Sequence, residues 1–357
     1  MIKYIGSKRR LVPVLGQVFA ALRPRTALDL FTGTTRVAQE LKRQGAEVWA
    51  VDSARYAEVL ARCYVATDGG SVDRAALAAA IDDLGRRPGR PGYVTETFCH
   101  RARYFQPKNG ARIDAIRDAI EAEHRGTPLY PLLLTSLLLA ADRVDSTTGL
   151  QMAYLKQWAP RSHNDLELRV PDLLAGPGHA RRGDATVVVD EVPPVDVAYL
   201  DPPYNQHRYF TNYHVWETLV AWDAPPHYGV ACKRLDSRDP STRSVFNDRR
   251  RMPDALRALI GRVRAEVVVV SYNDESWIGV DELVGMCRES RDAAEVLSFD
   301  SRRYVGAQIG IHNLAGVKVG AVSHLRNREL LVVAGARAAV AEAVAAARAA
   351  APEAAAS

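Results

Sequence analysis

Hydrophobic and polar positions alternate between helical and strand-like spacing over the first part of the chain. Residues 11–22 carry apolar positions at helical spacing, and the short apolar run 26–31 ends in a Thr-Gly-Thr turn. A second helical pattern continues to Gln44, a glycine then stops it, and residues 47–51 have the length of another strand. This order predicts a strand–loop–helix–strand unit, the opening of a doubly wound α/β sheet.

Residues 66–180 follow a different pattern, in which helical spacing prevails. An alanine-rich helix is predicted at 75–84, a break rich in glycine, proline and arginine follows at 85–92, and an apolar helix is predicted at 132–141. The strand–helix alternation of the first part is missing here. We therefore predict an inserted, mostly helical subdomain over 66–180.

The α/β character returns over residues 181–335. Four runs there have the composition of strands: 186–189, 195–200, 266–271 and 329–333. We predict that 1–65 and 181–335 build one domain around a common sheet. Residues 336–357 are nearly all alanine with a few charged residues, and we expect this tail to be disordered or a frayed helix.

The composition limits the classes of protein. Of the 357 residues, 47% are hydrophobic and 25% are charged, which is typical of a globular protein and excludes a chain disordered throughout. No apolar run reaches the roughly 18 residues of a membrane span, and the basic N-terminus lacks the apolar core of a secretory signal. The four cysteines lie far apart, and neither they nor the nine histidines have metal-site spacing. We therefore expect a cytoplasmic protein without membrane association or metal.

The sharpest chemical motif is Asp201-Pro202-Pro203-Tyr204, directly after the apolar run VDVAYL. The carboxyl end of a strand is where open α/β sheets bind ligands. The prolines restrict the backbone, so the Asp201 carboxylate and the Pro202 carbonyl can accept two hydrogen bonds from one exocyclic amine. Tyr204 can stack on the ring that carries the amine. A strand-end turn with a satisfied aspartate is the plainer alternative.

The loop after the first predicted strand has a single glycine, Gly33, where a dinucleotide fingerprint has three. One glycine still lets the backbone approach a ligand closely. Asp52 ends the second predicted strand 19 residues after Gly33, about where such folds bind ribose hydroxyls. A tight turn and a surface acid are the alternatives for these two features, and their combination with Asp201 favours a binding site.

In this order the motifs resemble those of the DNA adenine-N6 methyltransferases of the alpha group, the Dam-type enzymes that use S-adenosylmethionine. The resemblance covers most of residues 1–333. The start KYIGSK is similar to the family motif K-W-x-G-G-K, LDLFTGT to its cofactor loop, FTNYH to its F-T-x-Y-H stretch and NRELL to its closing K-V-D-E-L-L strand. This chain departs from the family at Tyr4, Ser7 and Thr34, where tryptophan, glycine and glycine are usual.

The resemblance implies a Rossmann-like methyltransferase sheet, S-adenosylmethionine as cofactor, and a DNA target-recognition role for the 66–180 insert. It implies six cofactor-binding residues: Tyr4, Lys8, Asp29, Gly33, Asp52 and Asp184. It implies four catalytic residues: Asp201, Pro202, Pro203 and Tyr204.

Basic residues cluster in three segments, 97–117, 229–264 and 300–328. The second holds ten lysines and arginines against four acidic residues. A solvated basic face is the alternative for any one cluster, but all three beside methyltransferase motifs favour contacts with DNA phosphates. Residues 142–158 also resemble, distantly, a DNA-contacting hairpin of the family. The candidate DNA-binding residues are Arg143, Arg249, Arg250, Arg251, Arg302 and Arg303.

These features predict a site-specific enzyme that extrudes an adenine from double-stranded DNA and methylates its N6 amine. Two alternatives stay open: an RNA base-amine methyltransferase, such as one acting on ribosomal RNA guanine-N2, and a non-catalytic DNA-binding protein on the same fold. Cytosine-N4 enzymes usually carry serine where Asp201 stands. The sequence leaves open whether a cognate restriction endonuclease acts beside the enzyme. Asp201 far from Gly33 and Asp52, or locked in a buried ion pair, would contradict the interpretation.

Overall fold

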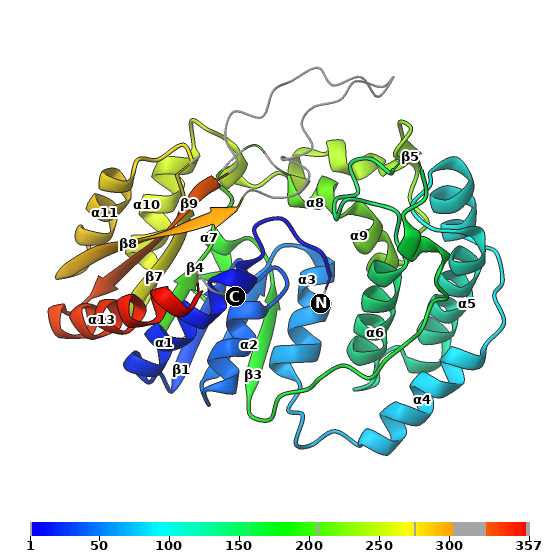
Figure 1. Cartoon of the computed structure of the whole chain (residues 1–357), viewed down its shortest axis with the longest axis horizontal. Helices are drawn as coiled ribbons and strands as arrows, with labels where there is room; N and C mark the ends of the chain where they lie inside the picture. Colours follow the sequence, from blue (N-terminus) through cyan, green and yellow to red (C-terminus); the bar gives the residue numbers. More distant parts are fainter. Residues whose placement is uncertain are drawn as a thin grey trace.

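The centre of the computed structural model is a seven-stranded sheet in the order β3-β2-β1-β4-β7-β9-β8 (Figure 1). The structure describes residues 2–155, 157–204, 206, 208–274, 276–302 and 326–354. The strands are β1 (Thr26–Leu30), β2 (Glu47–Asp52), β3 (Gly178–Arg182), β4 (Val195–Leu200), β7 (Ala265–Asn273), β8 (Ala293–Arg302) and β9 (Arg326–Gly335). Neighbouring strands run parallel except where β9 pairs with β7 and β8.

The strand order reverses at β1, which pairs with β2 on one side and with β4 on the other. This confirms the predicted doubly wound sheet. The loops that follow β1 and β4 leave the same edge of the sheet side by side, because the two strands are parallel neighbours. The motif loops of the sequence, one around Gly33 and one beginning at Asp201, are therefore brought together by the topology.

Helices cover both faces of the sheet, because alternate residues of each strand point to opposite sides. In β4, Val197 and Tyr199 join one core, while Ala198 and Leu200 join the other. The first core is covered by α1 (Val12–Leu22), α2 (Arg36–Arg43), α3 (Arg55–Ala61) and α13 (Arg337–Ala354). The second is covered by α7 (Ala185–Val188), α10 (Met252–Arg262) and α11 (Val280–Arg288).

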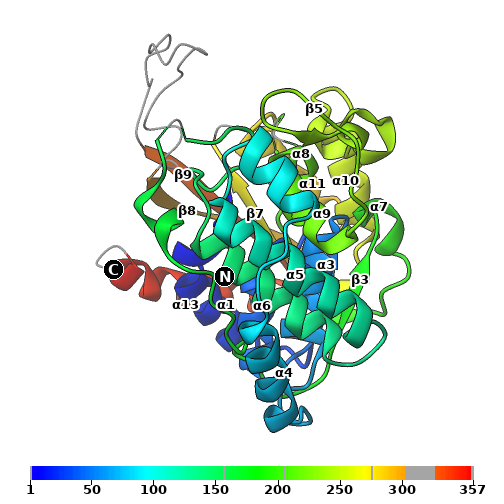
Figure 2. The same ribbon diagram turned by 90° about the vertical axis from the view of Figure 1, so that its right-hand side faces the viewer.

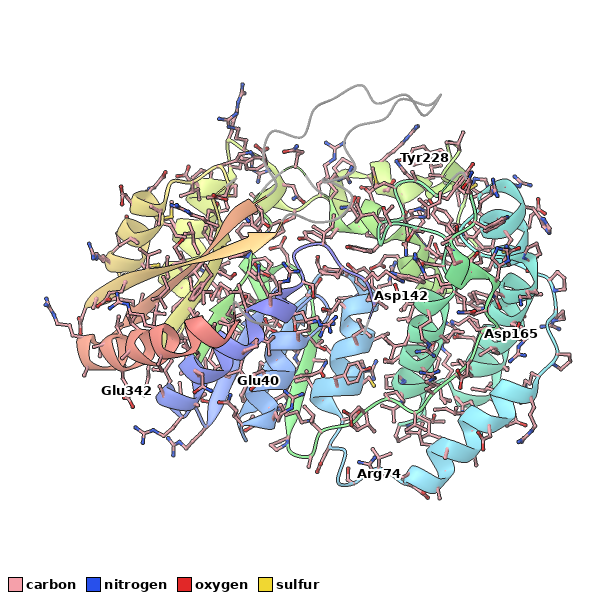
Figure 3. The ribbon with its side chains drawn as sticks, viewed as in Figure 1. Glu40, Arg74, Asp142, Asp165, Tyr228 and Glu342 are labelled. Carbon is pink, nitrogen blue, oxygen red and sulfur yellow. The ribbon has the colours of Figure 1, made fainter. Side chains whose placement is uncertain are left out.

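The residues between β2 and β3 form a helical layer beside the sheet (Figures 1 and 2). Its helices are α4 (Arg74–Arg86), α5 (Pro107–His124) and α6 (Tyr130–Arg143), with shorter turns η2 (Arg62–Ala66), η3 (Thr95–Arg101) and η4 (Pro160–His163). Helix α6 packs against α3 and α9 (His214–Ala221). Asp142, at the end of α6 (Figure 3), accepts a hydrogen bond from Lys3 at 3.0 Å, so the N-terminus is tied to this layer.

One sequence prediction of local structure is wrong. Residues 186–189 are not a strand: Asp184 accepts a hydrogen bond from the Thr186 backbone at 2.8 Å and starts helix α7, and this cap outweighs the β-branched run. The alanine-rich tail, for which disorder or a frayed helix was expected, forms helix α13, which buries Val340 and Val344 against the core. Strands β3 and β8 were not predicted.

Membrane-spanning segments are absent from the described residues, since no helix there is both long and apolar enough. Cys63, Cys99, Cys232 and Cys287 are buried and unpaired. Within the same residues, no three His, Cys, Asp or Glu side chains come together as ligands for a metal ion.

Candidate active site

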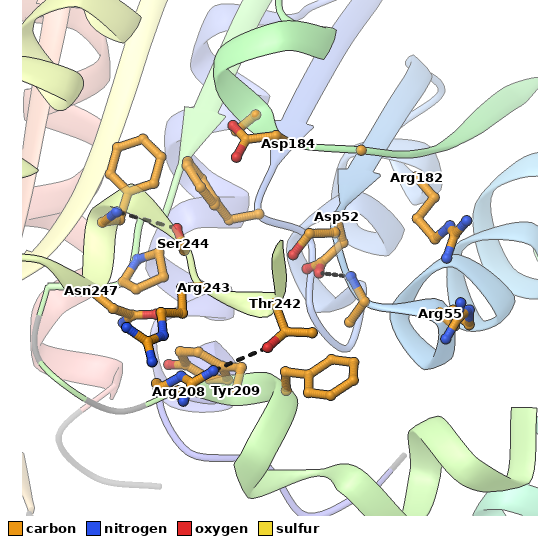
Figure 4. Close-up of a pocket in the computed structure, with 18 of the residues that line it drawn as sticks. Asp52, Arg55, Arg182, Asp184, Arg208, Tyr209, Thr242, Arg243, Ser244 and Asn247 are labelled. Atoms are coloured by element: carbon orange, nitrogen blue, oxygen red, sulfur yellow. Dashed lines mark hydrogen bonds between the residues drawn. The ribbon is translucent and has the colours of Figure 1, made fainter. Parts of the chain in front are cut away.

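A cavity of about 500 Å³ opens at the carboxyl ends of β1, β2 and β4 (Figure 4). Six parts of the chain line it: residues 4–6, the loop after β1, the loop after β2, residues 182–185, the segment after β4 with α8 (Tyr209–Asn212) and α9, and residues 235–247. We call residues 235–247 the strap. Five of the predicted residues line the cavity: Tyr4, Asp52, Asp184, Asp201 and Pro203.

Asp52 joins the two loops that form one wall of the cavity. Its Oδ2 accepts a hydrogen bond from the Gly33 backbone at 2.8 Å, and its Oδ1 accepts one from Ala54 at 2.9 Å. Burial raises the pKa of Asp52, while these backbone donors oppose the rise. Each carboxylate oxygen has further lone pairs, so Asp52 can accept bonds from a ligand diol as well.

Gly33 supports the cavity from behind and does not line it. Its φ of +50° is unfavourable for a residue with a side chain, and a Cβ placed there would lie 3.1 Å from the Tyr4 ring. The Tyr4 ring is held in turn by stacking on Tyr213, with centroids 4.6 Å apart, and on Tyr209 at 5.3 Å. Glycine at position 33 therefore lets this aromatic stack sit directly against the loop after β1.

Asp29 lies deeper than the resemblance suggested. It is 1% exposed, and its Oδ2 accepts bonds from the Thr32 hydroxyl at 2.8 Å and the Ala38 backbone at 3.0 Å. Burial raises the pKa of Asp29 to about 7. Its Oδ1 has no hydrogen-bond partner among the described residues. Asp29 thus shapes the loop and holds one unsatisfied acceptor, although it does not line the cavity.

Asp184 lies on the cavity wall beside Asp52, as Figure 4 shows. Its carboxylate caps α7 by accepting bonds from the Thr186 backbone at 2.8 Å and hydroxyl at 2.6 Å. The side chain is otherwise exposed. Three acids that the sequence singled out, Asp52, Asp184 and Asp201, therefore line the same cavity.

Asp201 forms a mostly buried ion pair with Lys8, whose Nζ lies 2.9 Å from Oδ1. The sequence interpretation assigned Lys8 to the cofactor and required that Asp201 not be locked in such a pair. The pair is present, yet 20% of the Asp201 side-chain surface stays exposed and Asp201 lines the cavity. Lys8 also lies 3.6 Å from Glu329 on β9. Lys8 therefore lies behind Asp201 and is not part of the cavity lining.

The charge states of this pair follow from burial and contact. Burial raises the pKa of Asp201 to about 6, against the opposing effect of Lys8. For Lys8, burial alone would lower the pKa, but the carboxylates of Asp201 and Glu329 raise it well above its usual value. Lys8 is thus protonated throughout the physiological range.

The remaining motif residues lie beside the cavity. Pro202 is buried, and the Tyr204 ring meets Tyr272 edge-on with centroids 5.8 Å apart. Neither Pro202 nor Tyr204 belongs to the lining, whereas Tyr209 and Phe210 do. The aromatic side chains that line the cavity are therefore Tyr4, Phe31, Tyr209, Phe210 and Phe246.

The candidate DNA-binding arginines lie in different surroundings. Arg249, Arg250 and Arg251 are exposed in the turn before α10, directly after the strap. Arg143 is half-buried at the end of α6 and donates to the Glu167 carbonyl, which favours a structural role. Arg303 lies outside the described residues, and the Arg302 side chain is not described either.

Sequence reasoning missed one wall of the cavity. Phe246 of the strap meets Phe31 edge-on at 5.1 Å, and Glu217 of α9 lines the cavity although it is fully buried. Arg208 and Arg243 also line it. No periodicity marks the strap in the sequence. In the loop opposite, Phe31 has a φ of +82°, which indicates local backbone strain. These residues come together through tertiary packing alone.

Comparison of the sequence with models of known families identifies its family. The model of the D12 class N6 adenine-specific DNA methyltransferases matches residues 4–286. The chain belongs to this family.

Individual relatives agree with the family. The type II methyltransferase M.NlaIII of Neisseria lactamica is 29% identical over 299 residues, which cover 79% of this chain and 86% of the relative. The modification methylase StsI of Streptococcus sanguinis is 28% identical over 306 residues, or 81% of this chain, but this chain spans only 46% of that relative. A solved structure, the precorrin-6Y C5,15-methyltransferase of Geobacter metallireducens GS-15, aligns with 92% of this chain and 90% of its own, at 10% identity and a TM-score of 0.27.

Membership of the D12 class confirms the resemblance drawn from the motifs and places the chain among DNA adenine methyltransferases. It argues against the alternative of an RNA base-amine methyltransferase. The match begins at Tyr4 and includes Asp52, Asp184 and Asp201, the three acids of the cavity. The roles of the individual residues remain predictions from the resemblance and the geometry.

Proposed function

We propose that this D12 class protein transfers a methyl group from S-adenosylmethionine to the N6 amine of an adenine extruded from double-stranded DNA. The observation that carries the proposal is the meeting of Asp52, Asp184 and Asp201 in one cavity at the switch point of the sheet. The family match supports the chemistry, and the geometry supports the assignment of roles to residues.

The residues of the cavity fit S-adenosylmethionine. Asp52 offers free lone pairs to ribose hydroxyls, Phe31 and Phe246 offer apolar surface to a purine, and Gly33 lets the Tyr4 ring pack against the loop after β1 and so shape the wall. The unsatisfied Oδ1 of Asp29 adds a buried acceptor beneath that loop. When bound, the cofactor supplies a methyl group carried on a positively charged sulfur.

Asp201 would activate the adenine amine. The amine is a poor nucleophile, since its lone pair is delocalised into the ring. Its two N–H groups can donate to the Asp201 carboxylate and to the Pro202 carbonyl, which draws the nitrogen towards tetrahedral geometry and makes the lone pair available. Lys8 holds Oδ1 at 2.9 Å and so fixes the direction of the carboxylate.

The same residue can take up a proton. A carboxylate of ordinary pKa, near 4, is a weak base for the proton released on methylation. Burial raises the pKa of Asp201 to about 6 and so makes it a stronger base than the sequence alone suggested. We therefore assign Asp201 both the orienting hydrogen bond and the acceptance of the proton.

An aromatic surface would hold the extruded base. Base stacking on aromatic side chains contributes roughly 1–3 kcal/mol per base. Tyr204, adjacent to the prolines, is the predicted stacking partner, and Tyr209 and Phe210 on the cavity wall extend that surface. The exposed arginines 249–251 would contact the DNA backbone, and the 66–180 insert would read the target sequence.

The names of the relatives bear on the biological setting. StsI is a modification methylase and M.NlaIII a type II methyltransferase, names of enzymes of restriction–modification systems. We propose the same setting for this chain, with a cognate restriction endonuclease acting separately on the same site.

The test is the variant Asp201→Asn, which keeps the shape of the side chain but loses the negative charge. We expect methyl transfer from tritium-labelled S-adenosylmethionine to unmethylated genomic DNA to fall by at least about a thousandfold. Cofactor binding, followed by calorimetry, should stay within a few fold of the wild type. Asp292→Asn, in an exposed turn away from the cavity, is the matched control and should be fully active. Near-normal turnover of Asp201→Asn would refute the role of Asp201.

A further inference from the structure

The carboxylates that line the cavity are all engaged within the chain. Asp52 binds the Gly33 and Ala54 backbones, and Asp184 binds Thr186. The other three have cationic or backbone partners: Asp201 with Lys8 at 2.9 Å, Glu217 with the Arg55 backbone at 2.7 Å, and Asp236 with Arg234 at 2.7 Å. Asp201, Glu217 and Asp236 thus lie beside a cation of the fold, whereas Asp52 and Asp184 accept hydrogen bonds from uncharged donors.

The arginines that line the cavity divide into two pairs. On one side, Arg182 lies 3.4 Å from Glu58, and Arg55 lies 4.0 Å from Glu217. On the other side, Arg208 and Arg243 form no ion pair with any residue that the structure describes. Arg208 donates only to uncharged groups of the strap, the Ser237 carbonyl at 2.6 Å and the Thr242 hydroxyl at 3.1 Å.

These two cations lie close to each other. Burial lowers the pKa of Arg208, and the positive charge of Arg243 lowers it further. The Nε of Arg208 is buried and has no hydrogen-bond partner among the described residues. Figure 4 shows Arg208 and Arg243 together on one side of the cavity, with Asp52 and Asp184 on the other. Two like charges held together without a counter-ion favour the binding of an anion from outside the chain.

The position of the pair indicates which anion it takes. Arg208 follows Tyr204 by four residues, so it lies on the segment that leaves the amine-binding motif. The residues assigned to the cofactor, Asp52 and Asp184, lie across the cavity. Two arginine forks match the oxygens of a phosphodiester, and arginine prefers such bidentate contacts.

We propose that Arg208 and Arg243 form a phosphate site that holds the DNA backbone beside the extruded adenine. The site rests on the proposed function, since that function brings DNA to the cavity. Arg208 also ties the strap through Ser237 and Thr242, so phosphate binding would draw the strap against the DNA. The contact positions the strand and carries no sequence information itself.

The main test uses Arg243→Gln, because no described interaction of the fold depends on the Arg243 side chain. Long-read sequencing first maps the positions that the enzyme methylates. Fluorescence anisotropy then measures binding to a short duplex that contains such a site, over a series of salt concentrations. We expect about tenfold weaker binding near physiological salt and a slope of log K against log salt that is reduced by about 0.9, the value for one lost phosphate contact. Arg243→Lys should keep most of the slope, since the charge is retained.

Two controls separate the possible explanations. Arg348→Gln, on α13 and paired with Glu295 at 3.7 Å, removes the same charge far from the cavity and should leave the slope unchanged. Calorimetry with S-adenosylmethionine alone should give the wild-type affinity for Arg243→Gln. A wild-type slope for Arg243→Gln would overturn the proposal, and so would a loss confined to cofactor binding, which would assign the pair to the cofactor carboxylate. Failure of the proposed function would appear separately, as wild-type protein that binds DNA without methylating it.

Discussion

The ionisation of Asp201 is controlled by a small buried network of charges. Burial raises its pKa to about 6, Lys8 at 2.9 Å opposes that rise, and Glu329 beside Lys8 supports it. Since the pKa is raised, the carboxylate form is complete only above about pH 7, and the protonated form appears as the pH falls through 6. Protonated Asp201 can no longer accept a hydrogen bond from an amine on that oxygen, so activity should follow its ionisation.

We predict that methyl transfer at saturating substrates falls as the pH decreases through about 6, by roughly tenfold per pH unit below that value. Lys8→Met should move this limb to higher pH, because removal of the cation leaves the carboxylate harder to ionise. Lys8→Arg should leave it nearly in place. Rates from pH 5 to 9 would measure both, with circular dichroism at each pH to exclude unfolding. A flat profile between pH 7 and 5 would show that Asp201 does not control the rate.

Single residues of the site could be predicted where a short local motif, such as an acid at the end of an apolar run, indicates their role. Asp52 and Asp201 each end a short apolar run, and the parallel pairing of their strands with β1 puts both at one edge of the sheet. Lys8 was assigned to cofactor binding from the resemblance, and sequence order could not show that its amine also lies against Asp201. Glu217 and Arg208 were missed, since each acquires its position from contacts far away along the chain.

Among the elements, α13 shows what composition leaves open. An alanine-rich segment has high helix propensity but little apolar surface, so sequence alone favours fraying. In the structure the helix packs against α1, with Val340, Ala343, Val344 and Ala347 on the buried side. Small side chains allow two helices to approach closely, and the two valines supply the apolar contact.

We predict that Val344→Asp destabilises the protein by about 3–5 kcal/mol, because it buries an unpaired charge between α13 and the core. Ala345→Asp, one position further on the exposed side of the same helix, should change stability by no more than about 0.5 kcal/mol. Urea unfolding of the two variants would give the comparison. Equal, small effects would mean that α13 is not part of the folded core.

The strands differ in how easily they can be predicted, because only buried strands have mostly apolar sequences. The central strands β1, β4 and β7 are buried on both faces and appear in the sequence as largely apolar runs. The edge strand β3, with the sequence GHARR, is only partly buried and has no apolar run to find. Strand β8 lies at the opposite edge of the sheet, where the charged residues of its sequence conceal it.

At the scale of the whole molecule, the helical insert and the sheet share one core. A single cluster of buried side chains runs from Phe19 of α1 through Phe98 and Leu137 of the insert to Trp216 of α9. Lys3 adds a polar tie, since it pairs with Asp142 at the end of α6. The boundary expected from the sequence near residue 66 therefore separates stretches of chain but not independent hydrophobic cores.

A shared core predicts that the insert and the sheet unfold together. Leu137→Ala, which removes a side chain only 1% exposed in α6, should lower the free energy of unfolding by about 2–5 kcal/mol. It should shift the transitions seen by far-ultraviolet circular dichroism and by tryptophan fluorescence by the same amount, because Trp216 lies in the core that both parts share. Val187→Ala, a truncation at a side chain that is 59% exposed, should move neither transition measurably. If Leu137→Ala instead splits the unfolding curve, the insert has a core of its own and can separate from the sheet.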